Sequence, residues 1–157
     1  MDPTRQLLRH TLATLAYRAA KPLRDAPESF CKFRPAENAR TAVEILAHMG
    51  DLFDWALSAV QGQERWHSAK PQPWADETAR FFASLAAFDA YLATDAAMHV
   101  SADTLFQAPI ADALTHVGQL SLMRRLAEAP VRAENYLVAK IVVGSVGADQ
   151  PAPVREF

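Results

Sequence analysis

Three residues whose side chains can bind metals lie in two separate apolar segments, and two of them are spaced by about one helical turn. His48 lies in the first segment, and Asp112 and His116 lie in the second. A spacing of four residues on a helix places Asp112 and His116 one above the other on the same face. Two imidazoles and one carboxylate are the ligand set of several zinc hydrolases and non-heme iron enzymes, in which other coordination positions stay open. The sequence therefore predicts a metal site, provided that the two segments meet in the fold.

Each of these residues also has a structural explanation when it is taken singly. A lone histidine on the inner face of a helix, such as His48 or His116, is more often a hydrogen-bonded core residue than a ligand. A carboxylate near the start of a helix, as predicted for Asp112, is favoured by the helix dipole. Together the three are harder to explain in this way, because buried polar groups cost free energy unless they find partners. One metal ion would satisfy all of them.

Three further residues are weaker candidates. Glu44 and Asp51 flank His48 by about one helical turn and could orient its ring, although a capping role or a solvated helix face explains them equally well. Cys31 has no histidine near it in the sequence, so we expect it to pack as a small apolar residue rather than to act as a nucleophile.

The elements that would position these residues are predicted from helical periodicity and from local start and stop signals. Asp2-Pro3 is typical of a helix start, and the stretch 41–44 (Thr-Ala-Val-Glu) forms a capping box. The predicted helices run from residue 3 to the prolines at 22 and 27, from 41 towards 62, from about 76 to 93, and from Pro109 to just before Pro130. They favour an all-α four-helix bundle over residues 3–130, followed by an irregular C-terminal extension over 131–157. We expect a single domain over residues 1–157.

Composition argues against several classes of partner. The 16 basic and 18 acidic residues give a formal net charge of -2 without a long basic run, so we expect no nucleic-acid ligand. No apolar stretch reaches the roughly 18 residues of a membrane span, and the N-terminus lacks the features of a signal peptide. The single cysteine cannot form an internal disulfide, which suits a reducing compartment. These features predict a cytoplasmic protein without membrane contact, and the alanine-rich helix faces predict a homodimer.

The two histidine segments resemble those of the DinB-like (DinB/YfiT) superfamily of metal-binding four-helix bundles. That family has a histidine in its second helix followed by an aspartate and a tryptophan, a pattern found here from His48 to Trp55. Near the start of its fourth helix it has a His-x-x-x-His pair followed by Arg-Gly-Gln, and the matching stretch here runs from Asp112 to Gln119. The resemblance covers about residues 3–130. It implies that His48, Asp112 and His116 bind one divalent metal ion.

The chain departs from the family pattern at two positions. Asp112 replaces the first histidine of the pair, and Val117 replaces the arginine that follows the second. Aspartate can still bind a divalent metal, so we expect the site to persist with a harder, more anionic ligand set. Zinc, nickel, iron and manganese are all compatible with it.

Characterised members of the superfamily include thiol-dependent transferases and isomerases in which the metal activates a low-molecular-weight thiol. The resemblance therefore implies a metal-dependent thiol S-transferase or isomerase, or a related hydrolase, that acts on a small-molecule substrate. Asp51 or Tyr136 would then assist proton transfer. Many members have no assigned reaction, which leaves open a non-catalytic, stress-related binding or interaction protein with a structural or regulatory metal site. The sequence does not choose between these functions and identifies no catalytic residue.

Overall fold

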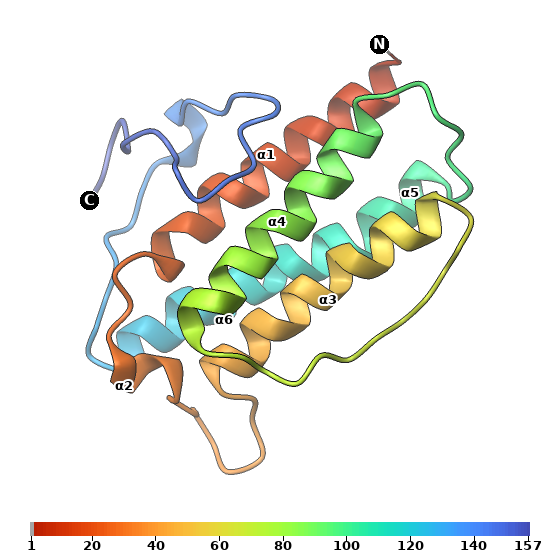
Figure 1. Ribbon diagram of the computed structural model, residues 1–157. Coiled ribbons are helices and arrows are strands. Elements are labelled where there is room, and N and C mark those ends of the chain that lie inside the picture. The colour runs from red at the N-terminus through yellow and green to blue at the C-terminus, as the bar shows by residue number, and fades with distance from the viewer. Residues whose placement is uncertain (1) are drawn as a thin grey trace.

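The computed structural model describes residues 2–157, and its regular structure is helical (Figure 1). Four long helices form a bundle, and shorter helical segments lie between and after them. In chain order the elements are α1 (Pro3–Leu23), α2 (Glu28–Cys31), α3 (Ala42–Val60), α4 (Trp74–Leu92), α5 (Ala102–Leu105), the π-helix η1 (Phe106–Ile110), α6 (Ala111–Leu126) and the 3-10 helix η2 (Tyr136–Val138). No strand forms within residues 2–157, so the predicted all-α four-helix bundle is confirmed. None of these helices combines the length and apolarity needed to cross a membrane.

Local hydrogen bonds confirm the predicted starts of α1 and α3. The Asp2 carboxylate accepts a hydrogen bond from the amide of Arg5 at 3.1 Å, and Pro3 occupies the first helical position. At α3, the Thr41 hydroxyl accepts from the amide of Glu44 at 3.3 Å, while the Glu44 carboxylate accepts from the amide of Thr41 at 2.6 Å. These bonds satisfy amide donors that have no partner within the helix itself.

Other predicted boundaries need correction. Helix α1 continues to Leu23 with Pro22 in its last turn, and α4 begins at Trp74 rather than near residue 76. The stretch that contains Cys31 forms the short helix α2 rather than a linker. Phe30 of this helix is fully buried and packs edge-on against Trp74, with ring centroids 5.5 Å apart. Because this packing joins segments far apart in the sequence, the local pattern could not predict it.

The last helix of the bundle begins earlier than predicted. Helices α5, η1 and α6 follow one another without a break, and Ser101 is the N-cap residue whose hydroxyl accepts from the amide of Thr104. The predicted start, Pro109, lies inside the π-helix. Proline has no amide hydrogen, and in an α-helix its ring collides with the carbonyl of the preceding turn, so a wider π turn accommodates it. Asp112 lies in the first turn of α6, but α5 and η1 precede that turn without a break, so the free amides that the helix-dipole explanation requires lie near Ser101 instead.

The buried face of this helical segment includes His116 and passes directly beside Asp112. Its buried residues between positions 105 and 120 are Leu105, Pro109, Ile110, Ala113, His116, Val117 and Leu120. Within this part of α6 the apolar face is formed by Ala113, Val117 and Leu120. His116 is therefore buried at the edge of the core, whereas Asp112 lies further towards the surface.

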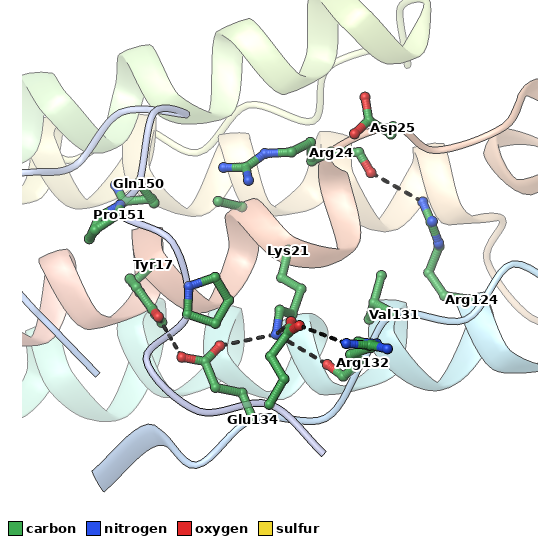
Figure 2. A pocket seen from close by; sticks show the side chains of 13 residues that line it. Tyr17, Lys21, Arg24, Asp25, Arg124, Val131, Arg132, Glu134, Gln150 and Pro151 are labelled. Carbon is green, nitrogen blue, oxygen red and sulfur yellow. Dashed lines mark hydrogen bonds and ion pairs between the residues drawn. The ribbon is translucent and has the colours of Figure 1, made fainter. Parts of the chain in front are cut away.

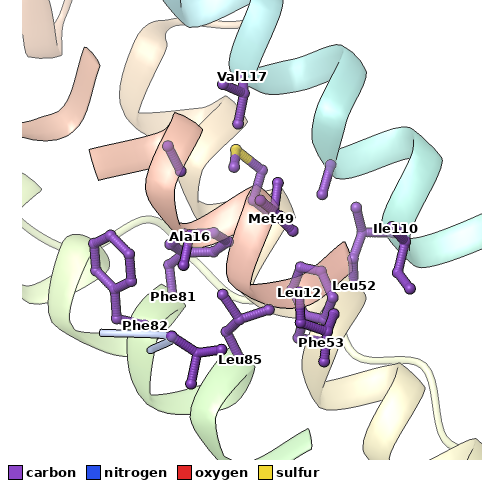
Figure 3. Close-up of a cluster of buried hydrophobic side chains, with 14 of the residues drawn as sticks. Leu12, Ala16, Met49, Leu52, Phe53, Phe81, Phe82, Leu85, Ile110 and Val117 are labelled. Atoms are coloured by element: carbon purple, nitrogen blue, oxygen red, sulfur yellow. The ribbon is translucent and has the colours of Figure 1, made fainter. Parts of the chain in front are cut away.

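The core lies between the four long helices and is rich in aromatic rings (Figure 3). The ring centroid of Phe53 in α3 lies 6.1 Å from that of Phe81 and 6.2 Å from that of Phe88, both in α4. The same cluster contains Met49 and Val117, which directly follow the two predicted histidine ligands in the sequence. Because consecutive helical residues point about 100° apart, these histidines lie at the margin of the core.

A charged cluster joins α3 to α4. Arg80 of α4 donates to Asp51 at 2.9 Å and to Glu77 at 2.8 Å, and both carboxylates are buried. The same guanidinium donates to the carbonyl of Ala47 at 2.6 Å. Gly50 makes room for it, because a Cβ at this position would lie 2.8 Å from Arg80 Cζ. The carboxylate of Asp51 therefore forms an ion pair with Arg80.

The C-terminal extension lies against α1 (Figure 1, Figure 2). Tyr17 donates its hydroxyl hydrogen to the buried Glu134, and Lys21 donates to Glu134 at 3.1 Å and to Glu156 at 2.8 Å. These contacts border a cavity of about 270 Å³. Apart from the short η2 and an isolated bridge between Glu134 and Glu156, the extension is irregular, as predicted.

Replacing Phe88 by alanine tests the aromatic core. The side chain is fully buried, so we expect Phe88→Ala to lower the free energy of unfolding by about 3–5 kcal/mol through lost burial and the cavity left behind. Phe157 is 69% exposed, so Phe157→Ala should change it by about 0.5 kcal/mol or less. Urea unfolding followed by circular dichroism measures both values. Equal, small effects at the two positions would contradict this packing.

Candidate metal centre

The side chains of His48, Asp112 and His116 converge where α3 faces α6. His48 Nε2 lies 3.3 Å from Asp112 Oδ2, and His116 Nε2 lies 3.4 Å from Asp112 Oδ1. The two imidazole rings are nearly perpendicular, with centroids 5.1 Å apart. One ligand atom from each residue lies within 4.8 Å of the other two. The fold thus brings together all three residues that were predicted to bind a metal.

These separations suit one metal ion. Two ligand atoms that are each about 2.1 Å from a tetrahedral ion lie about 3.4 Å from each other, close to both carboxylate–imidazole distances. The two imidazoles are mostly buried, whereas the Asp112 side chain is 42% exposed. An ion held here would have three protein ligands and a side towards solvent, the arrangement that leaves a coordination position for water or substrate.

Gln119 orients the ring of His116. Its side-chain carbonyl lies 2.7 Å from His116 Nδ1, one helical turn along α6. Because a carbonyl oxygen only accepts, Nδ1 carries the proton, and in the neutral imidazole Nε2 then carries the lone pair. A hydrogen bond of this kind on the far nitrogen is the usual support of a metal-binding histidine.

The contact between His116 and Asp112 therefore lacks a hydrogen-bonding proton when the imidazole is neutral. The Nε2 lone pair and the carboxylate oxygen Oδ1 face each other at 3.4 Å, and both atoms are acceptors. The two atoms repel each other unless a cation, either a proton or a metal ion, lies between them and attracts both. His48 Nε2 is directed at the other oxygen of the same carboxylate, so a metal ion would serve all three groups.

His48 is held in a state that suits a ligand. Burial, the positive charge of Arg40 and the neighbouring His116 lower the pKa of His48 below its usual value, against the opposing effect of Asp112. The imidazole is therefore neutral at neutral pH, as metal binding requires. The ring of Trp66, from the segment between α3 and α4, packs edge-on against His48 with centroids 5.8 Å apart.

Two residues that could have supported His48 have other roles. Glu44 belongs to the capping box of α3 with Thr41. Asp51 forms an ion pair with Arg80 on the α4 side of α3. The capping explanation therefore holds for Glu44. Asp51 is buried in an ion pair rather than on a solvated helix face, and it is not free to assist proton transfer at the site.

Tyr136 and Cys31 make their contacts elsewhere in the fold. The guanidinium of Arg18 lies 4.0 Å above the Tyr136 ring, and Tyr17 packs against the same ring with centroids 6.4 Å apart. Cys31 Sγ lies 3.5 Å from the carbonyl oxygen of Pro27, and burial raises the pKa of its thiol. A thiol with a raised pKa is a weak nucleophile, which agrees with the predicted packing role of Cys31.

The surface is hollowed on both sides of the site. On one side a mainly apolar groove of about 390 Å³ begins at His116 and Gln119 and includes Leu122 and Leu126. On the other side a more open hollow of about 440 Å³ is bordered by Asp112 and by residues of η1 and the start of α6. A small molecule could therefore approach the ligand atoms from the surface.

Gln119 and Trp66 contact the two histidines, and neither contact was predicted from the sequence. Gln119 carried a usable signal, because an amide three residues after a histidine can reach it on the same helix face. Trp66 carried none, since it lies in an irregular segment whose path depends on contacts such as that between Asp51 and the amide of Ala69, at 3.1 Å.

No family model, no curated protein and no solved structure was found to match this chain. The resemblance to the DinB-like superfamily therefore stays a prediction made from the two histidine segments.

The tautomer of His116 can be measured directly. We expect the neutral ring in the metal-free protein to carry its proton on Nδ1, because Gln119 accepts there. Gln119→Leu keeps the approximate size of the side chain but removes the acceptor and should abolish this preference. Long-range ¹H–¹⁵N NMR correlations at mildly alkaline pH distinguish the two nitrogens. A proton on Nε2 in the unmodified protein would contradict the arrangement.

Proposed function

We propose that this protein binds one divalent metal ion through His48, Asp112 and His116 and acts on a small molecule at the open side of that site. The observation that carries the proposal is the convergence of these three side chains, with His116 Nε2 and Asp112 Oδ1 facing each other 3.4 Å apart. The alignment of His48 with the second carboxylate oxygen supports it. The hollows beside the site would give a substrate access.

The donor set narrows the choice of metal only in part. Imidazole nitrogen suits zinc, nickel and iron, and carboxylate oxygen also suits manganese. The carboxylate adds a negative charge that a third histidine would not, which favours harder divalent ions. We propose zinc, nickel, iron(II) or manganese as the resident ion.

The resemblance to the DinB-like superfamily favours thiol transfer, isomerisation or a related hydrolysis as the reaction. A divalent ion at such a site lowers the pKa of a bound thiol or water and supplies a nucleophile near neutral pH. The chain's own contribution is positional: Gln119 fixes the His116 tautomer, and the burial of His48 keeps that imidazole neutral. A low-molecular-weight thiol is the proposed co-substrate.

A non-catalytic function is the alternative. Leu122 and Leu126 are 53% and 54% exposed beside the site, and exposed apolar side chains of this size favour contact with a partner or with a second copy of the chain. In that case the metal would hold α3 to α6 or regulate the contact, and the expected homodimer would form through this surface.

Substitutions of Asp112 test the metal proposal. A neutral amide is a poorer donor to a divalent cation than a carboxylate, so we expect Asp112→Asn to lose most of the bound metal while keeping the fold. Asp112→His supplies a third imidazole and should retain metal with altered selectivity. Elemental analysis of the purified proteins, after dialysis against each candidate ion, measures metal per chain.

The control for this experiment is Asp103→Asn, an exposed acid in α5, which should bind metal like the unmodified protein. Equal metal content in the unmodified protein and in Asp112→Asn would remove Asp112 from the site. An unmodified protein that binds none of the four ions would overturn the proposal as a whole.

A second variant tests the support of His116. Partners on the far nitrogen of a histidine ligand typically contribute about 10–100-fold to metal affinity. We therefore expect Gln119→Leu to weaken binding within that range without changing the stoichiometry. Gln6→Leu on α1, also at an exposed position, is the matched control. Competition with a metal-binding dye gives both affinities, and unchanged affinity in Gln119→Leu would exclude the supporting role.

A further inference from the structure

The apolar groove beside the site follows one face of α6. His116, Gln119, Met123 and Leu126 all line it, at spacings of three and four residues. This stripe extends from the candidate metal centre to Leu126, the last residue of α6, over about 15 Å at about 1.5 Å per residue. The groove is thus elongated, with the metal ligand His116 at one end.

The far part of the groove is apolar and open. Leu122 and Leu126 expose about half of their surface, and Ile45 of α3 and Pro35 of the preceding segment add apolar surface. A ligand that covers these side chains removes apolar surface from water, which favours an aliphatic or aromatic body.

The groove also presents hydrogen-bond donors and positive charge. Arg40 is exposed and makes no hydrogen bond or ion pair at contact distance within residues 2–157, although it lines the groove. Arg40 directly precedes Thr41, the N-cap residue of α3, and it lines the same groove as Gln119. Gln119 uses its carbonyl for His116 and keeps the N–H donors of its amide. These groups complement an anion with acceptor oxygens.

We propose that the groove binds substrates in which a carboxylate is attached to an elongated apolar body. The carboxylate lies between Arg40 and the amide of Gln119, and the apolar body extends along α6 over Leu122 towards Leu126. This inference rests on the proposed function, because the groove places such a molecule next to the metal ligands. It names the substrate class of that site as amphipathic carboxylates.

Octanoate is the probe, and octylamine and acetate are its matched comparisons. Octylamine keeps the chain and reverses the charge, whereas acetate keeps the carboxylate and lacks the chain. We expect saturable binding of octanoate and much weaker binding of the other two, with NMR shifts at Leu122 and Leu126. Titration of both the zinc-loaded and the metal-free ¹⁵N-labelled protein separates the groove from the ion. Octanoate should bind both forms, and more tightly when zinc is present.

Substitutions test whether Arg40 binds the carboxylate and whether the two exposed leucines bind the apolar chain. Arg40→Gln should weaken the binding of octanoate by about tenfold, the usual effect of losing a charged hydrogen bond. The same change should leave the binding of octanol nearly unchanged. The double change Leu122→Ser and Leu126→Ser should weaken the binding of octanoate and the binding of octanol alike, by at least about tenfold. Leu137→Ser, in the extension where this leucine is 91% exposed, is the control and should change neither.

Three outcomes would overturn the inference. Octanoate that binds only the zinc-loaded protein, with no effect of the leucine changes, would be a ligand of the ion alone. No binding to either form would exclude this substrate class, while metal content in the Asp112 variants would still test the metal site separately. A dimer in analytical ultracentrifugation that the leucine changes convert to a monomer would identify the groove as an interface between two copies.

Discussion

The register of the last bundle helix is the constraint on which the candidate centre depends. Proline at position 109 is accommodated by a π turn, and in the helix that follows it the apolar buried face is formed by Ala113, Val117 and Leu120. This register puts His116 at the edge of the core and Asp112 beside it, where the carboxylate avoids the high cost of burial against apolar side chains. From there Asp112 reaches His48 of α3 and remains partly open to solvent. π turns inside α-helices are often found at functional sites for this kind of reason.

The acidic side chains of the bundle differ in the partners that the fold provides. The buried carboxylates Asp51, Asp89 and Glu134 are each paired with an arginine or a lysine, as buried acids require. Asp112 instead faces two histidines, with one oxygen directed at each ring. Pairs of the first kind join helices or attach the C-terminal extension to α1. The second arrangement is made of metal-binding groups, and this contrast distinguishes the candidate centre from the structural ion pairs around it.

Several features could be predicted because they depend on residues close together in the sequence. The start of α3 follows from hydrogen bonds between Thr41 and Glu44, which lie within one turn. The common face of Asp112 and His116 follows from helical geometry alone. The involvement of His48 is different, since no local rule joins residues 64 positions apart. It was predicted from the types of the three side chains and from the resemblance of both histidine segments to one family.

Other features were decided only by the tertiary structure, because they depend on contacts between distant segments. The stretch predicted as a linker forms the short helix α2, whose Phe30 is buried against Trp74. The ion pair with Arg80 removes Asp51 from the candidate site, although Asp51 lies only one turn from His48. The groove along α6 exists because the segment before α3 forms its second wall. The sequence by itself determined the four long helices, apart from their exact ends, and the chemical types of the candidate metal ligands, since these follow from local geometry and residue identity. Packing decided which polar groups meet, because the free energy of a buried polar group depends on the partners that distant parts of the chain bring to it.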